Sequence, residues 1–339
     1  MKKGVMITLL IIAGILSIVL GIGIGSVFIP PLDILKVFGH KLFGFDITGV
    51  SSTVISIVWS LRAPRVLLAF LVGGALSVSG AVMQSVLKNP LASSYTIGVS
   101  SGASFGACLV LIFGVTLPAL QYFALPLAGL SGGIITIFIV ILFSSKVNKN
   151  MGNQTVILAG MVFSLFINAI QTMLITVSRG GFEKLIMWQM GSFSLKEWSY
   201  VFIMCPVAVI GLYLLIRLSK DLDIMTFGEE QALAIGVDLK RKKWELLWIS
   251  SLLTGCAVAF SGVIGFIDLV TPHLVRKMFG PSHRYVLPMS AVLGGSFLVL
   301  ADLIARTVIP PNELPVGAVT ALLGAPFFAV IYFRKGKEQ

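Results

Sequence analysis

Charged residues are scarce in this 339-residue chain, in which Asp, Glu, Lys and Arg together make up only 12%. An average soluble domain has about 25%. Hydrophobic residues account for 57%, enough for about nine or ten membrane helices of ~20 residues each. A soluble fold could not hide so much apolar surface, because even a large fold leaves about a quarter of its surface in water. The composition therefore excludes a soluble enzyme and a receptor with a single membrane anchor.

Cysteine is also rare. Cys108, Cys205 and Cys256 all lie in apolar stretches, which predicts packing residues rather than a disulfide or a metal site. The three histidines do not have the spacing of metal ligands either. We therefore expect this chain to bind no metal ion.

The phosphate-binding loop G-x-x-x-x-G-K-[ST] is missing from the sequence. The chain cannot bind ATP through that motif, so an ATP-driven process would need a separate ATPase subunit. We accordingly expect a protein that is not itself an enzyme and that holds no cofactor of its own.

Long apolar runs dominate what is present. They predict an all-α, polytopic membrane protein with about ten transmembrane helices and one membrane domain over residues 1–339. The first run is longer than the apolar core of a signal peptide, so we expect it to remain as the first helix. The predicted segments are 5–28, 63–87, 96–117, 119–144, 154–178, 199–219, 245–264, 266–279, 285–307 and 315–333.

The net charge of +11 would indicate a nucleic-acid partner in a soluble protein. In a membrane protein, however, basic residues gather in cytoplasmic loops. An even number of spans puts both termini on the same side, and the basic residues at the two ends of the chain predict that this side is the cytoplasm. Most of the basic residues then lie in cytoplasmic loops. Arg62, Arg65 and Arg306 are the exceptions, because they fall at the predicted outer ends of helices. We expect an additional role for these three and no nucleic-acid partner.

The longest predicted cytoplasmic loop is 220–244. Within it, the segment from Gly228 to Gly236 is typical of a short helix bounded by glycines. An ordinary solvated loop and a docking site for a partner both fit this pattern. Elsewhere, Gly98, Gly102 and Gly106 repeat every four residues, a spacing that favours close helix packing.

Two chemical alternatives arise from polar residues in apolar runs. Residues 98–102 fit the G-x-S-x-G elbow of hydrolases, but the strand that this motif requires is not predicted before them. Asp268, His273 and Asp302 could form a proton relay in a proton-coupled secondary transporter. Asp302 also lies four residues before Arg306, a spacing that predicts an ion pair within one helix.

An ordered series of motifs over residues 5 to 333 resembles the permease family of bacterial ABC importers for iron–siderophores, haem and cobalamin. One residue departs from the pattern, because Asp268 stands where the family usually has the last Gly of Gly-Phe-Ile-Gly. The motifs that carry the resemblance are Arg62-Ala63-Pro64-Arg65, residues 73–84, Asn89-Pro90-Leu91-Ala92, residues 98–103, Gly265-Phe266-Ile267, Pro272-His273-Leu274-Val275-Arg276, His283-Arg284, residues 301–306, Glu313-Leu314-Pro315-Val316-Gly317 and Gly324-Ala325-Pro326.

This resemblance implies a ten-helix permease of the bacterial cytoplasmic membrane that works as a homodimer or heterodimer, with the substrate path between the copies. Two ATP-binding cassette subunits would use ATP and Mg on the cytoplasmic side, and an extracytoplasmic binding protein would deliver the ligand. Transport would proceed by alternating access. The expected substrate is a ferric siderophore, with haem and cobalamin as alternatives.

The resemblance also implies roles for individual residues. Arg62, Arg65 and Arg306 match outward arginines that pair with glutamates of the binding protein, which suits the bidentate geometry of a guanidinium. The segment that couples the permease to the ATPase corresponds to Gly228, Glu229, Glu230, Ala232 and Gly236. The cytoplasmic gate corresponds to Asn89, Leu91, Asn153 and Gln154.

Overall fold

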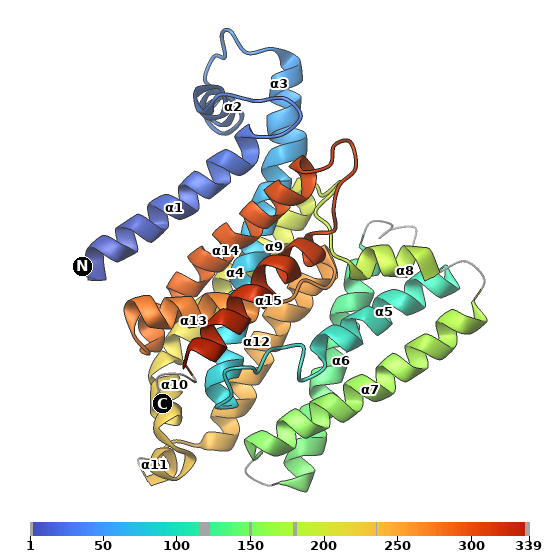
Figure 1. The fold of residues 1–339 in the computed structure, drawn as a ribbon, viewed down its shortest axis with the longest axis vertical. Coiled ribbons are helices and arrows are strands. Elements are labelled where there is room, and N and C mark those ends of the chain that lie inside the picture. The colour runs from blue at the N-terminus through green and yellow to red at the C-terminus, as the bar shows by residue number, and fades with distance from the viewer. Residues whose placement is uncertain (1–2, 115–122, 149–150, 179–181, 235, 336–339) are drawn as a thin grey trace.

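The computed structural model describes residues 3–114, 123–148, 151–178, 182–234 and 236–335. Every regular element in these ranges is a helix, which confirms the predicted all-α class. Most helices pack lengthwise into a bundle (Figure 1). One end of the bundle carries α2 (Pro31–Phe43) and α3 (Ser52–Ser56), and the opposite end carries α10 (Ser219–Phe227) and α11 (Glu229–Ala234).

Each of the ten predicted segments corresponds to a helix of the structure. The parts of segments 96–117 and 119–144 that fall in 115–122 lie outside the described residues. Two of these helices are short, namely α5 (Val99–Phe113) and α13 (Ile267–Phe279), and the last is α15 (Val316–Lys335). Seven are long and apolar enough to cross a membrane, namely α1 (Lys3–Gly23), the continuous stretch Ser52–Val86, α6 (Ala124–Val147), α7 (Asn153–Val177), α9 (Trp198–Arg217), α12 (Leu239–Ser261) and α14 (His283–Thr307).

The helix α4 (Ala63–Val86) forms the centre of the bundle, and nearly all its residues are buried. It packs against α12, α13 and α14. Glycines allow this close approach, because a Cβ atom at Gly73 would collide with the Gly294 carbonyl oxygen of α14. A Cβ atom at Gly80 would likewise collide with the carbonyl oxygen of Asp268. Small residues at such contacts let membrane helices pack backbone to backbone.

The glycine repeat at the start of α5 has the packing role that its spacing predicts. A Cβ atom at Gly102 would meet the carbonyl oxygen of Gly132 on α6, and one at Gly106 would meet that of Ala128. Gly98 adopts a left-handed conformation with φ of 89° directly before the helix. The motif around Ser100 therefore lies at a helix–helix contact, and no strand precedes it in the described part of the chain.

One cysteine does not pack inside the bundle as predicted. Cys108 and Cys256 are buried, but Cys205 is exposed. It lies on α9, where Phe202 is 70% exposed and Val209 is 58% exposed. The prediction was wrong at Cys205 because an apolar run does not reveal which of its faces points out of the bundle.

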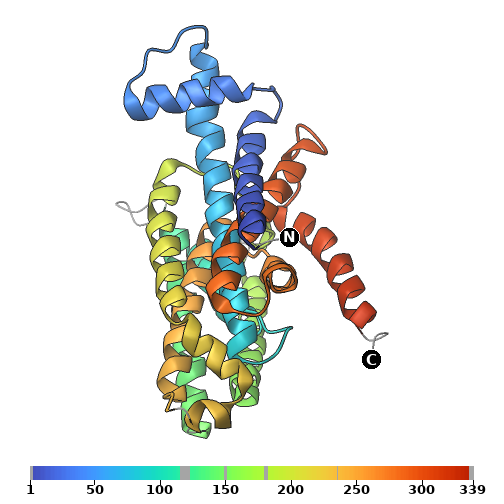
Figure 2. The same ribbon diagram turned by 90° about the vertical axis from the view of Figure 1, so that its left-hand side faces the viewer.

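Further helical segments lie where the sequence predicted no element, namely α2, α3, η1 (Ile57–Arg62), α8 (Phe182–Gln189) and α10. In Figure 2, α2 lies across the upper end of α3 and η1, roughly at right angles to them. Its short length and mixed polarity explain why a search for membrane-spanning runs misses it.

Candidate functional site

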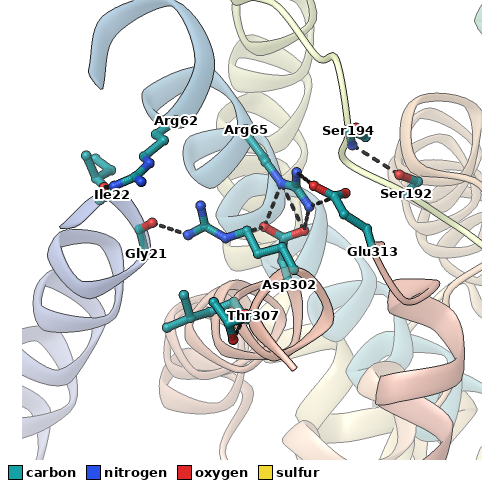
Figure 3. A network of polar contacts seen from close by, with 11 residues as sticks. Gly21, Ile22, Arg62, Arg65, Ser192, Ser194, Asp302, Thr307 and Glu313 are labelled. Atoms are coloured by element: carbon teal, nitrogen blue, oxygen red, sulfur yellow. Dashed lines mark hydrogen bonds and ion pairs between the residues drawn. The ribbon is translucent and has the colours of Figure 1, made fainter. Parts of the chain in front are cut away.

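The three predicted docking arginines lie at one end of the bundle. Arg62 and Arg65 lie near each other (Figure 3), and Arg306 pairs with Asp302, the carboxylate that also binds Arg65. Arg62 ends the π-helical stretch η1, Arg65 lies in the first turn of α4, and Arg306 lies in the last turn of α14. All are largely buried, with residue exposures of 6% for Arg62 and 9% for Arg65 and a side-chain exposure of 8% for Arg306. The described structure therefore places them together, but facing partners within the chain.

Arg65 binds two carboxylates at once. Its Nη2 and Nε atoms donate to Asp302 of α14 at 2.8 and 3.0 Å, and its Nη1 and Nη2 atoms donate to Glu313 at 2.8 and 3.0 Å. The two acids differ in exposure, since the Asp302 side chain is 1% exposed and that of Glu313 is 37% exposed. Such bidentate pairs are the strongest form of charge-assisted hydrogen bond. Arg65 thus joins α4 to α14 and to the loop before α15.

Arg62 and Arg306 bind the end of α1. Arg62 donates to the carbonyl oxygens of Ile22 at 2.9 Å, Gly23 at 3.0 Å and Val27 at 2.7 Å. Arg306 donates to the carbonyl oxygen of Gly21. The last carbonyl groups of a helix have no partner within it and carry a partial negative charge, so cations stabilise them. These two arginines therefore act as caps for α1.

The predicted ion pair between Asp302 and Arg306 is present at 3.8 Å. The sequence did not, however, indicate that Arg65 would be the nearer partner of Asp302. Asp302 and Glu313 both belong to the motifs, but they lie so far along the chain from Arg65 that the sequence did not predict a contact with it. With its carboxylate held by Arg65, Asp302 is an ion-pair partner rather than a free proton carrier.

At the opposite end, α11 confirms the short helix predicted between Gly228 and Gly236. Both glycines have positive φ, 153° and 88°, so they turn the chain at the two ends of this segment. Ala232 is fully buried, whereas Leu233 is 51% exposed. The side chains of Glu229 and Glu230, together with residue 235, lie outside the described part of the structure.

The four predicted gate residues lie in two local settings. The Asn89 Oδ1 atom accepts a hydrogen bond from the Leu91 backbone N–H at 2.9 Å, in the linker between α4 and α5. The Asn153 Oδ1 atom accepts one from the buried Lys243 ammonium at 2.9 Å, at the start of α7. Leu91 and Gln154 are both exposed. Lys243, which the sequence did not single out, thus fastens α12 to the start of α7.

The sequence pattern of the FecCD transport family matches residues 9–334. The chain belongs to this family. It is accordingly a permease of the ABC importer type with membrane-spanning helices, as the motif series indicated.

Several relatives share most of the chain. An ABC transporter permease of Bacillus subtilis, YvrB, is 44% identical over 94% of this chain and 90% of its own length. The cobalamin import permease BtuC of Halobacterium salinarum is 38% identical over 86% of this chain and 76% of its own. A solved structure, described as a metal-chelate type ABC transporter in an inward-facing conformation, has a TM-score of 0.85 and 29% identity, covering 98% of this chain and all of the other.

The two acids bound to Arg65 are expected to differ in their contribution to stability. Asp302→Asn leaves a buried guanidinium without its main counter-charge, which we expect to cost about 3–5 kcal/mol. Glu313→Gln affects a partly exposed pair and should cost less than about 1 kcal/mol. Thermal unfolding of the two variants in the same detergent measures the difference. Equal losses of stability would contradict this ranking.

Proposed function

We propose that this chain is the membrane permease of an ATP-driven importer that carries ferric siderophores across the bacterial cytoplasmic membrane by alternating access. The observation that carries the proposal is the similarity over 98% of the chain to a transporter of the metal-chelate type. Relatives named for haemin and Fe(3+)-citrate import also handle chelated iron. Relatives named for haemin, haem-iron and cobalamin import make haem and cobalamin the alternatives to be tested.

The proposed importer also needs other subunits, because this chain supplies only the membrane permease. Residues 1–339 form one permease domain, which pairs with a second permease copy in a homodimer or heterodimer. Two ATPase subunits use ATP and Mg on the cytoplasmic side, and an extracytoplasmic binding protein delivers the ligand. The absence of a phosphate-binding loop supports this division. Both termini then lie in the cytoplasm, as does the end of the bundle formed by α10 and α11.

Measurement of substrate uptake by purified components tests the proposed importer function. The permease, its ATPase and its binding protein are reconstituted in vesicles and supplied in parallel with a ferric siderophore, haemin or cobalamin. We expect uptake of the ferric siderophore that requires ATP and persists with a protonophore. Uptake without ATP that collapses with the protonophore would instead indicate a secondary transporter. Uptake of haemin or cobalamin alone would reassign the substrate and leave the permease function intact.

The coupling segment 228–236 is proposed to dock on the ATPase. The buried Ala232 anchors α11 on the permease, while the exposed Leu233 offers an apolar contact on the outside of the same helix. A charge at position 233 removes that contact without disturbing the buried anchor, since the residue is 51% exposed.

We expect Leu233→Glu to lower the amount of ATPase that co-purifies with the permease and to lower uptake in parallel, while thermal stability stays near that of the unchanged protein. Leu195→Glu is the matched control, because Leu195 is 91% exposed and lies outside the coupling segment. Loss of the ATPase from both variants, or from neither, would contradict the docking role.

We also propose that the cytoplasmic gate, which closes the substrate path, is formed by Asn89, Leu91, Asn153 and Gln154. The exposed Leu91 suits a side chain that closes against another surface. The hydrogen bond from Lys243 to Asn153 suits a fixed point at the start of α7, about which the rest of the gate could move.

The arginine cluster is proposed as the docking site for glutamates of the binding protein. Glu313 already occupies one side of the Arg65 guanidinium and is the more exposed of its two acids. An incoming carboxylate would therefore have to displace Glu313 from Arg65, while the buried Asp302 stays bound to the same guanidinium. Glu313 would act as a stand-in for the partner's carboxylate before docking.

Glu313→Gln removes the competing charge, so we expect the binding protein to bind several-fold more tightly. Measurement of affinity on permease held in lipid nanodiscs checks this, with Asp33→Asn as a control because its pair with Lys36 lies on the exposed helix α2. Unchanged or weaker binding by Glu313→Gln argues against docking at Arg65.

A further inference from the structure

Asp223 of α10 binds the first residues of α14. Its Oδ1 atom accepts hydrogen bonds from the His283 backbone N–H at 2.9 Å and from the His283 ring Nδ1 at 2.5 Å. Its Oδ2 atom accepts one from the Ser282 hydroxyl at 3.2 Å. A carboxylate at the start of a helix satisfies free N–H groups and the positive end of the helix dipole. The cap of α14 is thus supplied by a different helix, the one directly before the coupling segment.

His283 carries this contact into the bundle. Its side chain is 2% exposed, and its Nε2 atom lies 2.6 Å from the Ser85 hydroxyl of α4. Because a carboxylate can only accept, Nδ1 must bear a proton, and this fixes the orientation of the ring. An imidazole held at both nitrogens has no freedom to turn. A series of hydrogen bonds through the imidazole therefore connects Asp223 to Ser85.

Arg276 of α13 binds the same turn of α4. It donates to the Ser85 hydroxyl at 3.1 Å, to the Ala81 carbonyl oxygen at 2.9 Å and to the Gln84 side-chain oxygen. Gln84 in turn donates to the Asp268 carbonyl oxygen at 3.0 Å, in the first turn of α13. The contacts form one continuous series across four helices, α10, α14, α4 and α13, which converge at the lower left of Figure 1.

We propose that Asp223, His283 and Ser85 are positioning residues that transmit motion of the coupling segment to α4 and α13 at the centre of the permease. The proposal rests on the proposed function, because it needs an ATPase that moves α10 and α11. The peptide chain alone joins α10 to α14 only through α11, α12 and α13, whereas the Asp223 carboxylate joins them directly. Networks of this kind, with two arrangements available, carry coupling between distant sites.

Motion passes from α10 to α14 and then to α4 through hydrogen bonds. Buried hydrogen bonds act in a medium of low dielectric constant, so breaking one leaves costly unsatisfied groups. When α10 moves, the carboxylate draws with it the positive end of α14 and the imidazole. The ring then displaces Ser85, whose hydroxyl oxygen also accepts a hydrogen bond from Arg276. The helix α4 is buried on all sides and packs against α13 and α14, so a displacement there reaches the core of the protein.

The test measures ATP-dependent uptake and ATP hydrolysis together in vesicles that contain the whole complex of permease, ATPase and binding protein. The unchanged complex is measured first, with the ferric siderophore that it transports. If it shows no ATP-dependent uptake, the proposed function fails before the network is addressed. The variants are Asp223→Asn, His283→Gln, Ser85→Ala and Ser85→Thr.

Glu245→Gln is the matched control. The Glu245 side chain is 33% exposed against 35% for Asp223, and it pairs with Arg241 at 3.0 Å and with Lys242 at 3.3 Å. The separate pair of Lys242 with Asp221 of α10 stays in place when Glu245 is changed. The substitution therefore removes a carboxylate of similar exposure, from α12, that does not belong to the series of contacts.

We expect Asp223→Asn, His283→Gln and Ser85→Ala to lower uptake per ATP hydrolysed by about tenfold. Hydrolysis continues in these variants, and Ser85→Thr, which keeps the hydroxyl, retains most of the coupling. Glu245→Gln keeps the ratio of the unchanged complex. A double variant of Asp223 and His283 should be no worse than the single ones, because both changes interrupt the same series.

Two outcomes overturn the proposal. One is an unchanged ratio of uptake to hydrolysis in all of these variants. The other is a parallel fall of uptake, hydrolysis and thermal stability, with the ratio preserved. In that case the contacts merely hold the helices together. Should Asp223→Asn prevent assembly of the complex, the comparison of Ser85→Ala with Ser85→Thr decides between the two readings.

Discussion

The rest of the structure depends on the close approach of helix backbones around α4. In a membrane, apolar side chains gain little by packing on one another rather than on lipid, so close contact and hydrogen bonding hold helices together. Gly73 and Gly80 remove the side chains that would keep α14 and α13 away from α4. Once α4 is enclosed, its buried polar groups need partners within the protein, because an unpaired polar group is costly there.

That requirement explains where the charged residues lie. Near the first turn of α4, Arg62 and Arg65 use carbonyl oxygens of α1 and the carboxylates of Asp302 and Glu313. Near the last turn, Ser85 and Gln84 meet His283 and Arg276. The middle of the helix uses only hydroxyl groups, as in the contact of Ser79 with Ser94 at 2.7 Å. Charge is thus confined to the two ends of α4, the ends at which we propose that the binding protein and the ATPase dock.

Hydrophobic runs predicted the ten principal helices because length and apolarity are properties of a segment by itself. The short helix between Gly228 and Gly236 followed from its flanking glycines for the same reason. What the runs could not predict were contacts between distant segments, such as Arg65 with Glu313 or Asp223 with His283. They also could not show which face of α9 points outward, so Cys205 was misplaced. The sequence brought the three arginines to the same end of the fold, but it did not show what buries them. Arg62 and Arg306 cap the carbonyl groups of α1, whereas Arg65 lies between Asp302 and Glu313.

Asp268 illustrates how a departure from a family pattern is accommodated. The residue is 2% exposed and stands in the first turn of α13, after the left-handed turn at Phe266 with φ of 69°. An acidic residue in the first turn of a helix is favoured by the positive end of the helix dipole, but neither carboxylate oxygen of Asp268 has a hydrogen-bond partner in the described part of the chain. Its carbonyl oxygen lies against Gly80 and accepts from Gln84, so the backbone geometry needed at this contact is the same whatever the side chain. The close approach of α13 to α4 therefore constrains Gly80 far more strongly than position 268, and a change at 268 leaves the packing of the central helix in place.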